Sequence, residues 1–425
     1  MEASAVGGMG VSVTDGVAGL PPQATRVRIK VRNKIRDRMS TSYQGKREPS
    51  TFTFRPYFPL WLGNTSQYKL FFPDIIKVEV TLLERYQENN MRKITDFNVK
   101  FWGVRGSHPV PGEGTQRYGG NTSCLEVQAG EHTIIFDAGT GIIGLGRDLA
   151  QRTSQNGQPV KAVLLFSHLH HDHTQGLPFF APLYFPTTHL DLFVPNLYEK
   201  DPKTVLAEVM SAPVFPVSFR QTGAKKRLRS LCQTQVVVVN GNEVSAHSTL
   251  PAGLPENAVI IRTMHSYAHP QGVMIYRVEY QGKSLVYATD TECYAGGDQR
   301  LVNFARRADL LIHDAQYSED HYVGALAGAP VTQGYGHSTA SMACGTAQEA
   351  GVGQLVLFHH DPNYADKTIA SIENQARKVF ANTLAAREGQ MIKLGERRSQ
   401  PKMEDTLPLA KIQQRQPRAT NWASA

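Results

Sequence analysis

Hydrophobic residues recur along the chain in short runs, and from Phe97 onward these runs are regular enough to predict a series of elements. Alternating or continuous apolar residues predict strands over 98–107, 125–128, 133–137, 161–166, 235–239, 259–263, 273–280, 284–288, 309–313 and 355–359. Helices are predicted over 145–151, 204–210, 338–350 and 365–388, and Pro-rich loops over the rest of 176–258. Short strands followed by strands that alternate with helices predict an α+β fold, in which helices cover a sandwich of sheets.

Two stretches, one at each end of the chain, lie outside this pattern. Residues 1–90 contain an alternating run over 26–32, which predicts a strand, and an aromatic-rich stretch broken by prolines. Because Met91 stands directly before the regular part, we interpret residues 1–90 as an accessory or poorly ordered extension, or as the result of a start site assigned too far upstream. Residues 396–425 are polar and predict a disordered tail. The main domain is therefore expected over 91–395.

The composition indicates a protein with a substantial core and no membrane segment. The 425 residues are 41% hydrophobic and 19% charged, and the purely aliphatic runs are too short to span a bilayer. The four cysteines are scattered without a C-x-x-C pair, which argues against a disulfide framework and fits a reducing compartment. No apolar leader follows the first methionine, so we expect a cytoplasmic location.

The net charge of +8 is concentrated in one basic arm. Nine Lys or Arg residues lie between Arg26 and Arg47, against one acidic residue, Asp37. Such an arm attracts nucleic acid or phosphate surfaces, but a solvated basic segment is the more common explanation. Nucleic acid is therefore kept as a secondary partner.

The densest group of chemically active residues follows the strand predicted over 161–166, in residues 167–176 (SHLHHDHTQG). His168 and His170 are two positions apart, so they point the same way on an extended chain. Asp172 and His173 follow at a turn, where adjacent side chains diverge and can reach a second ion. Imidazole nitrogen together with carboxylate oxygen suits zinc, iron or manganese rather than calcium. The cluster therefore predicts a metal site.

These residues resemble the metallo-β-lactamase fold superfamily. The motif H-x-H-x-D-H over 168–173 follows Asp137 in residues 136–141 (FDAGTG), and later motifs recur in order at strand ends within Phe97–Leu394. Residues 101–107 (FWGVRGS) and 118–124 (YGGNTSC) look like those of bacterial hydrolases near its phosphodiesterase branch. That branch holds tRNase Z and the phosphoribosyl 1,2-cyclic phosphate phosphodiesterase. The resemblance implies a four-layer αββα sandwich, preceded here by the N-terminal extension.

The resemblance also implies a third histidine ligand, for which His265 and His269 compete. In the phosphodiesterase branch this histidine precedes a Gly-Tyr pair, with the tyrosine seven positions on. His269 lies seven positions before Tyr276 and His265 does not, so His269 is preferred. Ile275 replaces the usual glycine, and His265 stays open as the alternative.

Two metal sites follow from the resemblance. Asp290 matches the carboxylate that bridges both metals, and two neighbouring dications need such a shared anion. His359 matches the last ligand, with His360 beside it as the rival. Site one is then His168, His170 and His269, and site two is Asp172, His173 and His359, with Asp290 and a hydroxide between the ions. Asp137 is expected behind the ligands, where it orients a histidine, and His171 binds nothing.

Two further motifs suggest phosphate chemistry. Residues 313–316 (HDAQ) stand where tRNase Z has its His-Glu-Ala-Thr motif, and residues 336–340 (GHSTA) match its His-Ser-Thr motif. The resemblance implies that His337 protonates the leaving oxygen or holds the scissile phosphate, and it joins Asp172 as the expected catalytic residue. The alternative for His337 is a polar residue at a helix N-terminus. His313 and Asp314 are expected to support the site from behind.

The predicted function is hydrolysis of a small, cyclic phosphodiester by a metal-bridged hydroxide. We expect two divalent ions as cofactors, with zinc first and Mn²⁺ or Fe²⁺ as alternatives. Only 21 positions separate His269 from Asp290, with a tight turn over 281–283, so the long arm of bacterial tRNase Z has no room there.

Three other functions are compatible with this type of metal centre to different degrees. A tRNase Z-like ribonuclease, aided by the basic arm, is the runner-up, and an acyl hydrolase (lactonase- or β-lactamase-like) of the same fold is the other alternative. A diiron oxidoreductase of this fold would have glutamate at position 170, where this chain has histidine. We expect a small phosphodiester as the partner, nucleic acid less so, no membrane, and a homodimer as an option.

Overall fold

Two mixed β-sheets form the centre of the protein in the computed structural model, which describes residues 97–196, 201–293 and 297–394. All of these residues lie within one compact unit of the chain, Phe72–Ala425. The predictions for the extension 1–90, including the strand over 26–32, the basic arm and the role of Met91, lie outside the described residues. The same holds for the tail 396–425.

The first sheet has the strand order β15-β1-β2-β3-β4-β5-β6. Its strands are β1 (Phe97–Gly103), β2 (Cys124–Ala129), β3 (His132–Phe136), β4 (Lys161–Leu165), β5 (His189–Pro195), β6 (Lys225–Leu231) and β15 (Met391–Lys393). β15, β1, β2 and β3 pair antiparallel, whereas β3 to β6 are parallel. In β1, buried and half-buried residues alternate, so that Phe97, Val99 and Phe101 reach the core.

The second sheet has the strand order β14-β13-β12-β11-β10-β9-β7-β8. Its strands are β7 (Val236–Asn240), β8 (Glu243–His247), β9 (Val259–Ser266), β10 (Val273–Tyr280), β11 (Lys283–Ala288), β12 (Leu310–Asp314), β13 (Leu355–Phe358) and β14 (Thr383–Ala385). β8, β7, β9, β10 and β11 pair antiparallel, and β11 to β14 are parallel.

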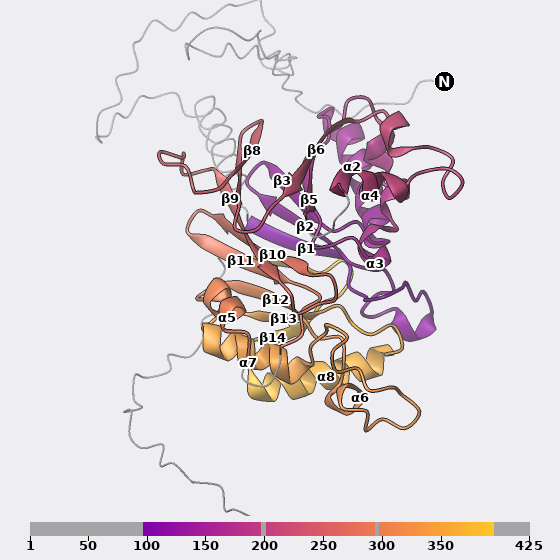
Figure 1. Ribbon diagram of the computed structural model, residues 1–425, viewed down its shortest axis with the longest axis vertical. Helices are drawn as coiled ribbons and strands as arrows, with labels where there is room; N and C mark the ends of the chain where they lie inside the picture. The colour runs from indigo at the N-terminus through magenta and orange to yellow at the C-terminus, as the bar shows by residue number, and fades with distance from the viewer. Residues whose placement is uncertain (1–96, 197–200, 294–296, 395–425) are drawn as a thin grey trace, which may run out of the picture. The chain divides into compact units, whose positions relative to one another are not determined.

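Three apolar layers hold the sheets and helices together. The inner faces of both sheets share one buried cluster, in which Phe136 on β3 packs on Tyr287 on β11 with ring centroids 5.3 Å apart. A second cluster lies between the first sheet and α2 (Gly141–Asn156) and α4 (Pro202–Glu208). A third joins the second sheet to α5 (Gln299–Ala305), α7 (Ala340–Ala350) and α8 (Asp366–Val379). The predicted α+β sandwich in four αββα layers is confirmed (Figure 1).

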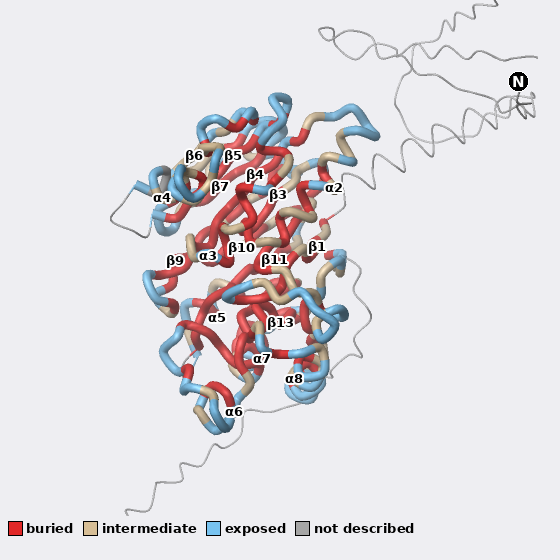
Figure 2. The backbone as a smooth tube through the Cα atoms, turned by 90° about the vertical axis from the view of Figure 1, so that its right-hand side faces the viewer, coloured by how far each residue is buried: buried red, intermediate tan, exposed pale blue. Residues whose placement is uncertain are grey.

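The remaining described helices are single turns in the loops. They are α3 (His171–Thr174), α6 (Glu319–Tyr322), η1 (Glu113–Thr115), η2 (Leu177–Phe179), η3 (Ala181–Tyr184) and η4 (Phe219–Gln221). Burial follows the layers, because the strands are largely buried and the outward faces of the helices are exposed (Figure 2). No helix in the described ranges combines the length and the apolar character that crossing a bilayer requires.

Two predictions about secondary structure were wrong. The helix predicted over 365–388 ends at Val379, because Thr383–Ala385 pair with β13 as the parallel strand β14, and this pairing outweighs local helix propensity. Within 176–258, predicted to be mainly loops, the chain also forms β5, β6 and β8. β6 is an edge strand rich in Lys and Arg, a composition that hides an edge from pattern analysis and protects it from aggregation.

The topology brings strand ends from both sheets to one place. β3 and β4 of the first sheet run parallel, as do β11, β12 and β13 of the second, so within each set the carboxyl ends lie together. Main-chain and side-chain bonds join the sheets there, since Met274 N donates to the carbonyl of Ser167 at 2.8 Å and Tyr276 Oη to that of Phe166 at 2.6 Å. Polar residues that follow these strands are therefore brought together, as is usual for sites at parallel strand ends.

Candidate metal centre

Three residues of the centre leave their strands through the left-handed region of backbone conformation. Asp137 follows β3 with φ of 61°, Asp290 lies just beyond β11 with φ of 50°, and His359 follows β13 with φ of 63°. Residues other than glycine adopt this conformation rarely, at a cost on the order of 1 kcal/mol or more, and often at functional sites. The turns aim three polar side chains into the space beyond the strand ends.

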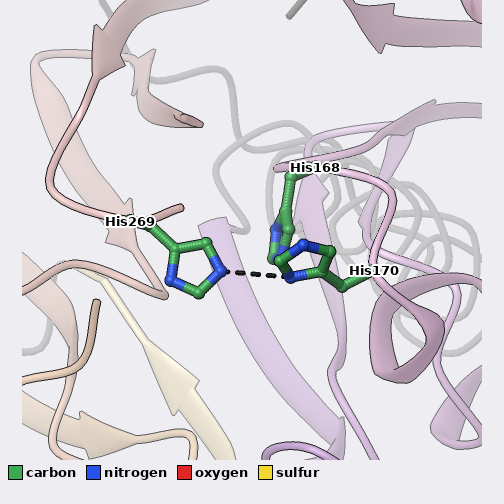
Figure 3. A group of neighbouring side chains, drawn as sticks. All are labelled: His168, His170 and His269. Atoms are coloured by element: carbon green, nitrogen blue, oxygen red, sulfur yellow. Dashed lines mark hydrogen bonds between the residues drawn. The ribbon is translucent and has the colours of Figure 1, made fainter. Parts of the chain in front are cut away.

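The first set of converging side chains is the three-histidine group, His168, His170 and His269 (Figure 3). His168 and His170 come from the loop between β4 and α3, and His269 from the turn between β9 and β10. Nε2 of His168 lies 3.0 Å from Nδ1 of His170, and Nε2 of His269 lies 3.1 Å from that same atom. Three ring nitrogens that meet at one point cannot all satisfy one another, whereas a cation between them would satisfy all three.

The second set is the four-residue group, Asp172, His173, Asp290 and His359, in which every side chain is buried. Asp172 and His173 stand in α3, and the other two follow strands of the second sheet. Nε2 of His173 and Nε2 of His359 are 3.3 Å apart, and Oδ2 of Asp172 lies 3.3 Å and 3.1 Å from them. The group therefore unites donors from both sheets.

The carboxylate of Asp290 faces both groups. Its Oδ1 lies 3.2 Å from Nε2 of His173 and 3.3 Å from Nε2 of His359. Its Oδ2 points to the other side, 3.7 Å from Nε2 of His168 and 3.9 Å from Nε2 of His269. A carboxylate with one oxygen toward each group has the placement that a bridge between two cations requires.

The spacing of the donors fits divalent metal. Tetrahedral zinc with nitrogen and oxygen ligands at about 2.0–2.1 Å places neighbouring ligand atoms roughly 3.3 Å apart. The separations of 3.0–3.3 Å within the two groups fit this value. The three-histidine group could hold one ion and the four-residue group a second, and the mixture of imidazole and carboxylate suits zinc, manganese or iron.

The electrostatics of the groups favour the same conclusion. Burial raises the pKa of Asp290, but the surrounding histidines, His359 first, outweigh burial and hold that pKa well below its usual range. Burial lowers the pKa of His168 well below its usual range and that of His269 to about 4. Burial lowers the pKa of His173, but three carboxylates, that of Asp290 first, outweigh burial and raise it. The same negative charge that favours a proton on His173 would favour a metal ion in place of that proton. Ionised carboxylates and unprotonated imidazoles are the forms that bind metal.

Each of the five histidines is held from behind through its other ring nitrogen. His168 Nδ1 donates to Ser167 Oγ at 3.0 Å, His170 Nε2 to Gln271 Oε1 at 3.3 Å, His173 Nδ1 to Asp137 Oδ2 at 2.9 Å, His269 Nδ1 to the carbonyl of Gly336 at 3.2 Å, and His359 Nδ1 to Gln316 Oε1 at 2.9 Å. Such bonds select the tautomer whose lone pair faces the centre.

Asp137 organises the loop that carries the histidine cluster. Its fully buried carboxylate accepts hydrogen bonds from Ser167 N at 2.7 Å, from Ser167 Oγ at 2.9 Å and from Tyr287 Oη at 2.8 Å, besides the one from His173. The structure therefore places Asp137 behind a ligand candidate, as the sequence predicts.

His337 lies against both groups. Its ring stacks on His359 with centroids 5.0 Å apart and 14° between the planes, and its Nδ1 donates to Asp314 Oδ2 at 2.8 Å. Burial lowers the pKa of His337, but Asp314 outweighs burial and raises it to about 9. The Asp314 carboxylate also accepts from the backbone N–H groups of Asp290 and Ser338, at 3.1 Å and 2.9 Å. Asp314 therefore ties His337 to the loop of Asp290.

The neighbouring His313 turns away from the centre. Its Nε2 lies 3.5 Å from Sγ of Cys293, and its Nδ1 donates to the backbone carbonyl of Asp314 at 2.7 Å. Of the two residues predicted to support the site, the structure brings Asp314 against it directly, and His313 acts at most through the strand end.

Three other histidines lie outside both groups. His265 is buried on β9, where its Nδ1 accepts from Gln233 Nε2 at 2.6 Å. His360 donates from Nε2 to the carbonyl of Ala386 at 3.0 Å, and burial lowers its pKa to about 3. His171 is exposed. The geometry therefore favours His269 over His265 and His359 over His360.

Several supporting residues could not be singled out from the sequence. Gln271 and Gln316 each orient a histidine, but a glutamine in a loop has no distinctive pattern in a single sequence. Ser107 donates its backbone N–H to Asp172 Oδ2 at 2.8 Å, and a backbone contact leaves no mark on residue type. Only the presence of Gln316 in the HDAQ segment and of Ser107 at the end of the stretch 98–107 pointed toward the site.

The chain is similar to known proteins in sequence and in structure. The family described as the β-lactamase superfamily domain matches residues 132–360, which is more than half of the chain. Ribonuclease Z from Salinibacter ruber is 27% identical over 310 residues, covering 66% of this chain and 91% of that protein. Ribonuclease Z from Archaeoglobus fulgidus is 26% identical over 325 residues, covering 69% and 96%. The crystal structure of the metallo-β-lactamase fold protein YhfI from Bacillus subtilis covers 70% of this chain and 99% of its own, with 18% identity and a TM-score of 0.49.

The adjacent residues His170 and His171 provide a matched test of the centre. Replacement of His170 by Gln should remove a donor at which two other ring nitrogens converge, and metal affinity should fall at least 10-fold. Replacement of the exposed His171 by Gln should leave the metal content unchanged. Metal analysis after equilibrium dialysis against zinc measures both variants. Equal zinc content in the two variants would argue against the three-histidine group as a metal site.

Proposed function

The chain belongs to the β-lactamase superfamily, as its sequence motifs predict, and we propose that it is a metal-dependent phosphodiesterase that hydrolyses a small, cyclic phosphodiester. The observation that carries the proposal is that two groups of side chains, each of which could hold a metal ion, lie side by side with His337 against them. The relatives named Ribonuclease Z support phosphodiester chemistry over acyl transfer.

The proposed cofactors are two divalent metal ions, with zinc first and Mn²⁺ or Fe²⁺ as alternatives. His168, His170 and His269 would hold one ion, Asp172, His173 and His359 the other, and Asp290 both. When bound, such ions lower the pKa of water toward neutrality and polarise the phosphoryl oxygens. Asp137 and Asp314 keep these side chains in place through the hydrogen bonds already described, and His313 supports the strand end that carries Asp314.

The proposed task of His337 is to deliver a proton to the leaving oxygen. Its Nδ1 is engaged by Asp314, so Nε2 is the nitrogen left to give a proton to the substrate. Expulsion of an alkoxide without a proton is slow, and a positioned general acid typically accelerates such a step about 10²–10⁴-fold. Asp314 would stabilise the charge that His337 carries before the transfer.

The small size of the substrate is inferred from the segment between His269 and Asp290. It consists of β10 and β11, which pair in register around a tight turn at Gln281 and Gly282. Between His269 and Asp290 the chain therefore forms a hairpin within the sheet, with no extension in this segment that could grip a folded RNA. A compact phosphodiester could reach the centre without such an arm.

A ribonuclease Z-like activity is the second candidate. It is favoured by relatives of that name, which align over nine-tenths or more of their own length. On this reading the substrate would be a nucleic acid, and the residues of the centre would keep the same roles.

Two further properties of the protein, a cytoplasmic location and the formation of a homodimer, stay predictions.

A substrate panel separates the two candidates. We expect the zinc-loaded protein to hydrolyse 2′,3′- or 3′,5′-cyclic nucleotides or a cyclic sugar phosphate in steady-state assays, and to cleave pre-tRNA poorly. Asp172→Ala should abolish turnover of every substrate, because Asp172 faces His173 and His359. Cleavage of pre-tRNA without turnover of any small phosphodiester would replace the first candidate by the second.

The role of His337 is tested by changing the leaving group. His337→Gln should lower kcat at least 100-fold for a phosphodiester with an alkoxide leaving group. For a p-nitrophenyl phosphodiester the loss should be less than about 10-fold, because p-nitrophenolate departs without a proton. Zinc content should be unchanged. An equal loss on both substrates would show that His337 positions the substrate and is not the proton donor.

A further inference from the structure

Tyr267 is an exposed aromatic residue that is nevertheless held in place. Its side chain is 73% exposed, whereas its neighbour His265 is 5% exposed, and their ring centroids are 4.3 Å apart. Gln233 Nε2 donates to Tyr267 Oη at 3.3 Å and to His265 Nδ1 at 2.6 Å. Single exposed aromatic residues are common on protein surfaces, but this ring is backed by another ring and fixed at its hydroxyl.

The ring lines a pocket that also contains a ligand candidate of the centre. The pocket has a volume of about 370 Å³ and is lined by residues 267–272 and Gly334. His269 belongs to this lining, and Gln271, also part of it, accepts a hydrogen bond from His170. A substrate whose phosphodiester lies at the centre can therefore extend its attached group over this loop.

The chemistry of the lining indicates what that group is. Gln271 and His269 are the polar side chains of the pocket besides Tyr267, and both are engaged by residues of the centre or its supports. Gln271 Oε1 and His269 Nδ1 are thus already occupied, and the largest exposed side chain of the lining is the ring of Tyr267. A nucleobase suits a fixed aromatic ring, because every base has a flat π-face that can stack on an aromatic side chain.

We propose that Tyr267 is a stacking platform for the nucleobase of the substrate, so that the enzyme prefers nucleotide phosphodiesters over base-free sugar phosphodiesters. The inference rests on the proposed phosphodiesterase function and names its substrate class. Holding the ring before the substrate arrives lowers the entropy cost of binding. His265 and Gln233 act as positioning residues for this platform.

The glycine at 272 is part of the same arrangement. Gly272 has φ of +87°, and a Cβ there would lie 2.4 Å from Nε2 of His265. Both the conformation and the close approach require glycine. The turn that follows His269 can thus pack directly on the ring that backs Tyr267.

The test compares two substrates that differ only in the base. These are 2′,3′-cyclic AMP and the 2′,3′-cyclic phosphate of methyl riboside, assayed with wild-type protein, Tyr267→Leu and Tyr267→Phe, all loaded with zinc. Tyr267→Leu should raise KM for cyclic AMP roughly 10-fold with kcat little changed, and should leave the base-free substrate unaffected. Tyr267→Phe keeps the ring and its contact with His265 but loses the hydrogen bond to Gln233, so it should raise KM for cyclic AMP much less than Tyr267→Leu does. An equal effect of Tyr267→Leu on both substrates, or no effect on either, would overturn the proposal.

Binding of the product separates this inference from the proposed function. Calorimetric titration with AMP should show about 10-fold weaker binding to Tyr267→Leu than to wild type or Tyr267→Phe, whether or not the protein turns over a cyclic nucleotide. Absence of turnover by wild type, with this binding pattern intact, would defeat the cyclic substrate and retain the platform. If Tyr267→Leu weakens only the cleavage of an RNA oligonucleotide and leaves AMP binding unchanged, the assignment to small nucleotides is wrong.

Discussion

The carboxylate of Asp290 is the link on which the centre depends, because it faces the three-histidine group with one oxygen and the four-residue group with the other. Two cations a few ångströms apart repel, and a shared anion offsets that repulsion. The main chain reaches this position through a left-handed residue and is anchored by a hydrogen bond to Asp314. The fold of the second sheet thus determines where the two halves of the centre meet.

The same constraint explains why so much of the surrounding structure is polar and buried. Five imidazoles can present lone pairs to one space only if each is bonded on its far side, and each is, through Asp137, Ser167, Gln271, Gln316 or a backbone carbonyl. Those partners come from both sheets and from the loops between them. A rigid set of donors loses little freedom when metal or substrate binds, which favours tight binding.

The sequence was sufficient for the family, the layers and the cluster, because strand runs are periodic and H-x-H-x-D-H is dense. The sequence was insufficient where contacts between distant parts of the chain decide whether a strand forms or which side chain reaches the centre. β14 forms only because β13 offers an edge, and the charged strand β6 lacks an apolar pattern. Spacing in the sequence favoured His269 but left His265 open. The structure places His269 beside His170, whereas the ring of His265 packs against Tyr267. Supports such as Gln316 act through position rather than residue type.

The proposed function requires one thing above all, the binding of two metal ions by residues that follow strands of both sheets. It is tested most directly by removing metal with a chelator and returning zinc in steps, with zinc content and phosphodiesterase turnover measured on the same sample. We expect no turnover without metal, and full turnover at two zinc ions per chain. Turnover by the metal-free protein, or full activity at a single ion with no second ion bound, would contradict it.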